Sequence, residues 1–389
     1  MNICMPAYTF YESDNRVRRY AETLAARGDT VDVVVLKQPG QKKYDILNGV
    51  NIYRIQERVR NEKGKLNYLF RLLKFLIKSM ILMTWKHFKR KYDLVHVHSV
   101  PDFEVFAALF VKMMGAKVIL DIHDLVPEFY NSKFGADKSS NMFKAMVFLE
   151  KISCSFADHV IISNHIWFDT VTSRSLSKNK CSVILNYPDQ KIFYKRERKR
   201  NDGKFIMVYP GSLNWHQGID IAVKAFHLIS KDVPEAEFHI YGQGPSENEL
   251  MMMISDLNLS DRIFMKGLRP IDEIASIVSD CDLGIIPKRN DPFGGEAFST
   301  KSLEFMSLGI PLTISRTKID QYYFNDSIVK FFEPDNEKDL ADMLLALITN
   351  TSLREALVKN AFKFIEDNKW DRKKYIYSNL VDSLTEYKS

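Results

Sequence analysis

The sequence lacks several features that would place it in other classes of protein. Its four cysteines, Cys4, Cys154, Cys181 and Cys281, are far apart, which fits a reducing cytosol and argues against disulfide bonds or a zinc site. The N-terminal MNICMPAY has neither a basic region nor a long apolar core, so we expect a first strand rather than a signal peptide. The loop after it lacks Gly-x-Gly-x-x-Gly, which argues against a nicotinamide or flavin site.

Length and charge suit a two-domain protein with anionic ligands. The 389 residues are too many for one ordinary core, and the 46% apolar content allows each half to bury its own core. The 55 Lys and Arg against 49 Asp and Glu give a net charge of +6, which favours anionic ligands or surfaces without implying nucleic acid.

Strands and helices alternate in both halves of the chain. Apolar Asn2–Ala7, the helical pattern of Arg16–Arg27 and the valine-rich Thr30–Leu36 predict a strand, a helix and a strand. The same order begins again at Phe205–Tyr209. The alternation predicts an α/β fold with two Rossmann-like, doubly wound parallel sheets. The charged run 195–204 is the best candidate for a linker.

The most informative stretch is Asp291–Ser315, DPFGGEAFSTKSLEFMSLGIPLTIS, which predicts a loop, a helix, a turn and a buried strand. Ser299 and Thr300 are good helix caps, and Gly309 ends the helical pattern. A helix that begins at the open end of a parallel sheet offers free N–H groups and partial positive charge to an anion. Lys301 in the first turn is unfavourable for the helix alone but helpful beside a phosphate.

Two carboxylates flank this helix start. Glu296 precedes the cap, and Glu304 lies about one turn into the helix. A carboxylate beside a bound phosphate suits the hydroxyls of a sugar or a ribose, which can donate hydrogen bonds to it. Two ordinary surface glutamates on a solvated helix are the alternative.

Glu296 and Glu304, with seven residues between them, and the following FMSLGIP resemble the signature of the retaining glycosyltransferases of family 4, also called group 1. The resemblance covers nearly the whole chain and is stronger in the second half. It implies the GT-B fold, in which two such domains face a cleft and a C-terminal helix crosses back to the first domain. The expected parts are an acceptor-binding domain at 1–190, a nucleotide-sugar-binding domain at 191–370 and a returning helix at 371–389.

The resemblance also implies roles for individual residues. The first glutamate contacts the donor sugar, the second contacts the nucleotide ribose, and the helix start binds the diphosphate. The residues expected to act in transfer are His123, Glu296 and Lys301. Those expected to bind the nucleotide sugar are Gly211, Ser212, Gln217, Phe298, Ser299, Thr300 and Glu304.

The glycine-containing turn at 210–218 departs from the family pattern. Relatives usually carry an Arg after the first glycine and a Lys before the second, both directed at the diphosphate. This chain has Ser212 and Gln217 at those positions. Lys301 is the expected substitute, with Lys288 and Arg289 as further candidates.

The segment Asp121–Glu128, DIHDLVPE, passes from a buried strand into a loop, where sites form on open sheets. The family often has a His-Asp pair here, and the resemblance implies that His123 reaches the donor sugar. Asp124 and Glu128 are candidates for orienting the acceptor. A histidine satisfied within the sheet end is the alternative.

Residues 64–91, GKLNYLFRLLKFLIKSMILMTWKHFKRK, contain eight Lys or Arg and no acid. The charges interrupt the apolar run too often for a transmembrane span. A basic, strongly apolar pair of helices is typical of a segment that lies on an anionic membrane, and Trp85 and Phe88 favour this interpretation. A core-packing helix with a solvated lysine face is the alternative.

The resemblance implies transfer of a sugar from a nucleotide diphosphate sugar to a hydroxyl, with retention of configuration. We expect no cofactor beyond the donor substrate and no required metal, because no Asp-x-Asp lies near the site. We also reject a metal site at His96, His98 and His123, which lack accompanying carboxylates at ligand spacing. A glycan or lipid-linked acceptor of cell-envelope polysaccharide synthesis, on the cytoplasmic face of the membrane, is the expected setting.

Two other functions stay open. A nucleotide-sugar 2-epimerase shares the two-domain architecture but needs no acceptor. A non-catalytic nucleotide-sugar-binding membrane scaffold would bind a nucleoside diphosphate without turnover. We expect no nucleic-acid partner, because the basic run is interleaved with Leu and Met rather than with aromatic residues spaced along strands.

Overall fold

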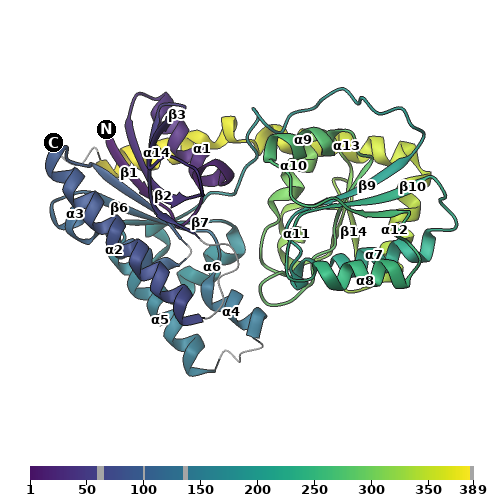
Figure 1. Cartoon of the computed structure of the whole chain (residues 1–389), viewed down its shortest axis with the longest axis horizontal. Helices are drawn as coiled ribbons and strands as arrows, with labels where there is room; N and C mark the ends of the chain where they lie inside the picture. Colours follow the sequence, from purple (N-terminus) through teal and green to yellow (C-terminus); the bar gives the residue numbers. More distant parts are fainter. Residues whose placement is uncertain (59–64, 100, 135–138, 386–389) are drawn as a thin grey trace. The chain divides into compact units, whose positions relative to one another are not determined.

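The computed structural model describes residues 1–58, 65–99, 101–134 and 139–385. The chain divides into two compact units, which are coloured along the sequence in Figure 1. The first comprises Met1–Asn186 with the C-terminal segment from Lys374, and the second comprises Tyr187–Lys373. Each unit is an α/β layer structure around one sheet, wholly parallel in the second unit and parallel except for one edge strand in the first, so the predicted fold class is confirmed.

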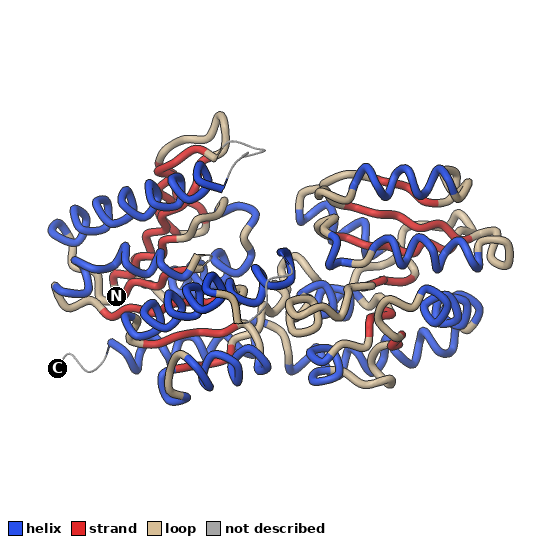
Figure 2. The backbone as a smooth tube through the Cα atoms, turned by 90° about the horizontal axis from the view of Figure 1, so that it is seen from below, coloured by secondary structure: helices blue, strands red, loops and turns tan. Residues whose placement is uncertain are grey.

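The described part of the first unit contains an eight-stranded sheet in the order β3-β4-β2-β1-β5-β6-β7-β8, parallel except for β3. The strands are β1 (Asn2–Pro6), β2 (Thr30–Lys37), β3 (Tyr44–Leu47), β4 (Val50–Glu57), β5 (Leu94–His98), β6 (Lys117–Ile122), β7 (His159–Ile162) and β8 (Cys181–Val183). The helices are α1 (Asn15–Ala26), α2 (Lys65–Lys89), α3 (Leu109–Met113), α4 (Val126–Phe134), α5 (Asn141–Phe156) and α6 (His165–Arg174). Helices cover both faces of the sheet (Figure 2), which explains why its central strands are continuous apolar runs.

The C-terminal helix α14 (Trp370–Thr385) returns to the first unit, as predicted. Tyr377 in α14 is fully buried, with its hydroxyl 2.8 Å from His96 Nδ1 and its ring centroid 4.3 Å from that of Tyr20. Residues 386–389 of the predicted returning helix lie outside the described residues.

The described part of the second unit contains six parallel strands in the order β11-β10-β9-β12-β13-β14. They are β9 (Phe205–Pro210), β10 (Ala236–Tyr241), β11 (Ile263–Met265), β12 (Leu283–Ile286), β13 (Leu312–Ser315) and β14 (Lys330–Phe332). The helices are α7 (Ile219–Ile229), α8 (Glu247–Asp256), α9 (Ile271–Ser279), α10 (Thr300–Leu308), α11 (Lys318–Tyr323), α12 (Glu337–Thr349) and α13 (Thr351–Asp367). The prediction of a linker at 195–204 is wrong, because the units divide between Asn186 and Tyr187. Residues 195–204 lie on the surface of the second unit, where Arg198 and Arg200 both form ion pairs with Asp282.

The antiparallel hairpin β3–β4 at one edge of the first sheet was not anticipated from the sequence. Its two-residue turn is Asn48-Gly49, with φ of 52° and 80°. Positive φ at both turn residues is the geometry that Asn-Gly favours in tight hairpins. The dipeptide was therefore a usable signal, hidden by the polar composition around it.

Candidate functional site

The predicted anion site lies where the winding of the second sheet reverses. Strand β9 continues to β10 on one side, whereas β12 lies on its other side and continues to β13. The segments after β9 and β12 therefore leave neighbouring strand ends in opposite directions. Ligands of open α/β sheets bind outside the carboxyl ends of the strands at such a reversal.

The helix α10 begins at this place, and Gly309 ends it in the left-handed conformation with a φ of 77°, as predicted. Ser299 occupies the N-cap position but makes no capping hydrogen bond, and its buried hydroxyl has no hydrogen-bond partner within the described ranges. Thr300 is the first helical residue. The predicted position of Ser299 as a cap is thus confirmed. Because the Ser299 side chain accepts no hydrogen bond from the backbone N–H groups of the first turn, these groups can donate to a bound anion.

The side chain of Lys301 lies against the turn that follows β9. Its Nζ donates to Gln217 Oε1 at 3.3 Å and lies 5.3 Å from the centroid of the Tyr209 ring. The Tyr209 hydroxyl donates to the same Gln217 oxygen at 2.9 Å. Gly211 permits this arrangement, because a Cβ there would lie 2.3 Å from Lys301 Cε. The ammonium therefore stands beside Gln217, the position of the expected but missing lysine.

Lys301 and Glu304 are half-buried and influence each other's ionisation. Burial lowers the pKa of Lys301 to about 8, an effect that Glu304 opposes and Lys288 reinforces. Burial raises the pKa of Glu304 to about 7, although the nearby positive charge of Lys301 acts to lower this pKa. Both groups consequently titrate near neutral pH, as is common at functional sites.

Nucleoside diphosphate affinity should therefore fall as the pH rises through about 8, the pKa of Lys301. Below that pH the ammonium is charged before the ligand arrives, whereas above it binding must take up a proton, because a neighbouring diphosphate favours the charged form. Calorimetric titration at a series of pH values, with whichever of UDP, GDP and ADP binds, measures this. The Lys301→Met variant should bind more weakly and lose the fall near pH 8. Wild-type affinity that does not change with pH would contradict a diphosphate at Lys301.

The loop before α10 holds Glu296. A Cβ on Gly294 would lie 2.6 Å from the Arg289 carbonyl oxygen, and one on Gly295 would lie 2.4 Å from Asn290 Oδ1. The glycines therefore serve close packing, which confirms the predicted tight loop. Glu296 Oε1 accepts a hydrogen bond from Lys318 Nζ at 2.8 Å, and the Glu296 side chain is 24% exposed.

The remaining predicted ligand-binding residues differ in their surroundings. Phe298 packs its ring on Tyr323 and Phe324, so its side chain belongs to the packing of α11. Ser212 is exposed on the turn after β9, and its carbonyl oxygen lies 2.9 Å from the Tyr209 hydroxyl.

Lys288 and Arg289, the two further candidates for replacing the missing cations, already form ion pairs within the second unit. The buried Lys288 Nζ lies 2.8 Å from Asp320 Oδ2 and donates to the Ala297 carbonyl at 2.7 Å. The Arg289 guanidinium donates two hydrogen bonds to Asp220, at 2.8 and 2.7 Å. Lys301 is thus the better candidate for a diphosphate contact.

His123 belongs to a polar cluster of the first unit that also contains Arg16, His98 and Asp121, a grouping that the sequence reveals only in part. Arg16 donates two hydrogen bonds to the buried Asp121, at 2.7 and 2.6 Å. His98 Nδ1 and His123 Nε2 lie 3.2 and 3.1 Å from Asp121 Oδ2. Burial would raise the pKa of Asp121, but Arg16 and His123 hold it well below its usual range. An ionised Asp121 therefore positions both histidines.

Three members of this cluster, His96, His98 and Asp121, place possible metal-ligand atoms within 4.8 Å of one another. Arg16, however, contacts both carboxylate oxygens, and His96 Nδ1 lies 2.8 Å from the Tyr377 hydroxyl. A cation would meet a guanidinium at the same carboxylate. The absence of a metal here stays a prediction that this arrangement favours.

The neighbouring acids differ in accessibility. Glu128 is buried and accepts two hydrogen bonds from Arg174, at 2.6 and 2.9 Å, which gives it a structural partner. Asp124 is half-buried, and burial raises its pKa. The His123 side chain is 22% exposed, whereas those of His96 and His98 are buried. His123 is accordingly the most accessible histidine of the cluster.

The basic segment forms one continuous helix, α2, so the prediction of a helix pair is wrong for its described part; residue 64 lies outside the described residues. One face is core, with Leu72 and Phe75 buried. Another face carries exposed apolar side chains three or four residues apart, the α2 stripe: Phe70, Leu73, Ile77, Ile81, Trp85 and Phe88. The two predicted alternatives therefore coexist on one helix.

No helix in the described ranges combines the length and the apolar character needed to cross a bilayer. A neighbouring helix also exposes apolar side chains. Helix α3 packs against α2 and exposes Phe110 and Met113, which are 46% and 75% accessible. Exposed apolar groups at such density on two adjoining helices mark an interaction surface.

Two family models match successive parts of the chain. The glycosyl transferase 4-like domain matches residues 13–186, and glycosyl transferases group 1 matches residues 190–364. Together these matches take in most of both units.

Several named proteins are similar in sequence. An uncharacterized glycosyltransferase of Methanocaldococcus jannaschii is 25% identical, over 75% of this chain and 76% of its own length. A phosphatidylinositol N-acetylglucosaminyltransferase subunit of Schizosaccharomyces pombe is 26% identical, over 66% of this chain and 54% of its own length. An O-antigen biosynthesis glycosyltransferase of Escherichia coli is 23% identical, over 67% of this chain and 70% of its own length.

Solved structures share the fold at low identity. Sucrose-phosphate synthase of Thermosynechococcus elongatus superposes with a TM-score of 0.81 at 17% identity, over 99% of both chains. A protein of Anabaena in complex with UDP-glucose gives a TM-score of 0.73 at 15% identity, over 98% of this chain and 99% of its own.

Proposed function

Because this chain belongs to the group 1 glycosyltransferases, we propose that it moves a sugar from a nucleotide diphosphate sugar to a hydroxyl of a glycan or lipid-linked acceptor, with retention of configuration. The observation that carries the proposal is the position of Lys301 across Gly211 at the start of α10. The UDP-glucose complex of the Anabaena neighbour and the O-antigen relative support a sugar nucleotide and an envelope glycan.

The residues of the second unit take distinct parts in this proposal. The uncapped first turn of α10, from Ser299, and the backbone of the Gly211 turn hold the diphosphate. Gln217 holds Lys301 in place until the donor arrives. Glu304 accepts hydrogen bonds from the ribose, and Glu296 accepts them from the sugar.

The chemistry needs charge stabilisation more than a nucleophile. Departure of the diphosphate builds negative charge on its oxygens, next to the Lys301 ammonium and the N–H groups of α10. The leaving phosphate takes the acceptor proton, and the chain's own cations serve in place of a metal. In the first unit, Asp121 orients His123, which contacts the transferred sugar.

Glu296→Gln should lower the transfer rate about tenfold or more, the scale of a weakened transition-state contact. Nucleoside diphosphate affinity should stay unchanged, because that ligand lacks the sugar. Glu333→Gln is the matched control, since the 60% exposed Glu333 carboxylate pairs with Arg316 on the surface of the same unit. A wild-type rate in the Glu296 variant would remove this residue from the site.

We also propose that α2 docks the protein on the anionic inner face of the cell membrane. The helix has no acidic residue, and the α2 stripe is bordered by Lys74, Lys78 and Lys89. Apolar burial in the interface and attraction of lysines to anionic lipids act together on such a helix.

The protein should sediment with anionic vesicles in low salt and be released in high salt, because screening weakens the lysine contribution. Phe70→Ser/Ile77→Ser should abolish sedimentation without lowering the melting temperature, since both side chains are exposed, at 67% and 49%. Sedimentation that persists unchanged in this variant would exclude α2 as the docking element.

The activity is tested with a panel of nucleotide sugars. Thermal stabilisation identifies the donor, and that donor is then incubated with and without hydroxyl acceptors while the released nucleoside diphosphate is measured. Transfer requires the acceptor, and NMR of the product reports the anomeric configuration. Conversion of the donor sugar without acceptor would indicate an epimerase, and tight binding without turnover would indicate a scaffold. Unchanged transfer in EDTA is expected for a metal-independent enzyme.

A further inference from the structure

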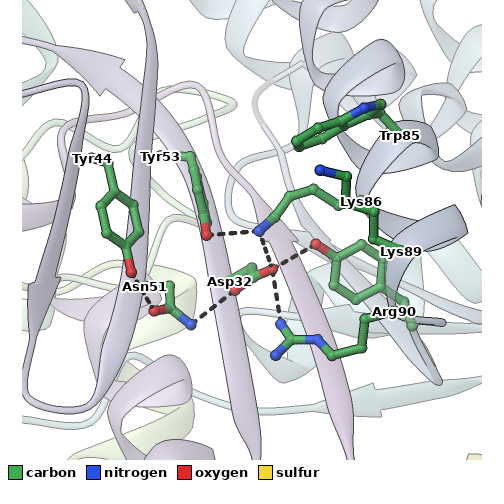
Figure 3. Close-up of a pocket in the computed structure, with 9 residues that line it drawn as sticks. Asp32, Tyr44, Asn51, Tyr53, Trp85, Lys86, Lys89 and Arg90 are labelled. Atoms are coloured by element: carbon green, nitrogen blue, oxygen red, sulfur yellow. Dashed lines mark hydrogen bonds and ion pairs between the residues drawn. The ribbon is translucent and has the colours of Figure 1, made fainter.

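A pocket of about 520 Å³ lies between the C-terminal end of α2 and the edge of the first sheet (Figure 3). We call it the basic pocket; its principal lining residues are Asp32, Tyr53, Trp85, Lys86, Lys89 and Arg90. Asp32 and Asn51 stand opposite each other near the amino ends of β2 and β4. His123 follows the carboxyl end of β6, which is parallel to β2 and β4. The basic pocket therefore lies at the amino ends of the strands, opposite the end at which the His123 cluster lies.

The basic pocket keeps a positive charge although it contains a carboxylate. The fully buried Asp32 accepts hydrogen bonds from Tyr92 and Asn51, and Lys86 and Arg90 lie 3.0 and 3.2 Å from its Oδ2. Figure 3 shows both cations directed at Asp32, which fixes them in the wall. Lys86, Lys89 and Arg90 together carry three positive charges and Asp32 carries one negative charge, so the lining has a net charge of +2.

The cations are held in place before any ligand arrives. Lys86 Nζ donates to the Tyr53 hydroxyl at 2.7 Å, and Lys89 Nζ lies 3.7 Å from the centroid of the Trp85 ring. Burial lowers the pKa of Lys86, but hydrogen bonds to Tyr53 and Asp32 outweigh it and raise the pKa overall. Fixed ammonium and guanidinium donors at short range suit a phosphate, which accepts several charge-assisted hydrogen bonds.

A second pocket, of about 480 Å³, adjoins the first and shares three aromatic residues with it. We call it the apolar pocket; six of its lining residues are aromatic or aliphatic, namely Tyr44, Tyr53, Ile55, Ile81, Leu82 and Trp85, and the other three are Lys43, Arg54 and Lys78. Ile81 and Trp85 also belong to the α2 stripe. A charged pocket joined to an apolar one matches an amphiphile, and Trp and Tyr are favoured where a polar head meets hydrocarbon.

We propose that one anionic phospholipid binds here, with its phosphate in the basic pocket and the start of an acyl chain in the apolar pocket. The proposal rests on the docking of α2 and gives that docking a specific lipid partner. Within the first unit, the site lies at the opposite end of the strands from His123, the residue of that unit assigned to transfer, so we assign the lipid to anchoring and not to the role of sugar acceptor.

Calorimetry with short-chain phosphatidylglycerol below its micelle concentration tests the site without a membrane. Lys89→Ala/Arg90→Ala should weaken binding at least about tenfold, the effect of losing charge-assisted hydrogen bonds. Lys231→Ala/Lys359→Ala removes the same charge from exposed lysines of the second unit and should bind as the wild type does. Should the double variant fold poorly, Lys89→Glu replaces it, because the ion pairs of Asp32 are formed by Lys86 and Arg90 and not by Lys89.

Two further ligands test the chemistry of the occupant. Short-chain phosphatidylcholine, whose head is zwitterionic, should bind more weakly than phosphatidylglycerol. Inorganic phosphate should bind much more weakly than either, since it cannot use the apolar pocket. Inorganic phosphate that binds as tightly as the lipid would overturn the lipid assignment.

Vesicle sedimentation separates this inference from the docking on which it rests. We expect Phe70→Ser/Ile77→Ser to leave the vesicles yet still bind the soluble lipid. If Lys89→Ala/Arg90→Ala binds soluble lipid as the wild type does, the lipid site is refuted even where docking stands. If the stripe variant stays on vesicles, docking by α2 fails, and the calorimetry still decides the lipid site.

Discussion

Lys301→Ala should lower the rate of sugar transfer about a hundredfold while leaving the protein at least as stable as the wild type. Loss of one preorganised donor to a developing anion typically costs this much. The stability expectation follows from the pKa of about 8, because folding places the ammonium where its charged form is disfavoured. A residue kept at a cost to folding is one that the site needs.

Lys231→Ala, an exposed lysine of the same unit, is the control and should change neither rate nor melting temperature. The two variants are compared by initial rates at saturating donor and by thermal unfolding. A Lys301→Ala enzyme with the wild-type rate would exclude the ammonium from the reaction. A large loss of stability would instead make Lys301 a structural residue.

Asp121→Asn should destabilise the first unit by about 3–5 kcal/mol, because it leaves the buried Arg16 guanidinium without its carboxylate. His98 and His123 would lose their common partner, so transfer should fall as well. The native pKa of Asp121 is depressed, so its contribution is present above the unfolded-state pKa of about 3.9 and is lost as the pH falls through the native value. The difference between variant and wild type should therefore shrink only in acid.

Glu22→Gln makes the same chemical change at the Arg18–Glu22 pair of α1, whose side chains are 21% and 12% exposed. Such a partly exposed pair at i and i+4 of a helix should contribute below about 1 kcal/mol. Urea unfolding followed by circular dichroism compares the two variants. Equal destabilisation would mean that the Asp121 ion pair has no special weight in the fold.

The sequence predicted the α/β class, most strand positions and the α10 turn, because these depend on local signals. Gly309 after an apolar helical run and the valine-rich β2 are readable without knowledge of the fold. The hydrogen-bond partner of Lys301, Gln217, could not be predicted from the sequence. Their contact joins residues from different loops and depends on a glycine that gives the lysine room.

The Arg16–Asp121 pair was missed for the same reason. Arg16 begins a predicted helix and Asp121 begins a predicted site segment. The two residues are nevertheless far apart in sequence and come into contact only when the sheet assembles. The basic pocket was also beyond sequence reasoning, because it needs the β3–β4 hairpin beside α2. Spacing along the chain indicates which residues share an element, but not which loops come together.

The central claim is that the start of α10, with Lys301 and the Gly211 turn, holds a diphosphate. Calorimetry with a nucleoside diphosphate, the matching monophosphate and the matching nucleoside measures this directly for the uridine, guanosine and adenosine series. We expect one diphosphate to bind far more tightly than its monophosphate and nucleoside, with most of the difference lost in Lys301→Ala. Equal affinities within each series, or no binding by any diphosphate, would contradict the account.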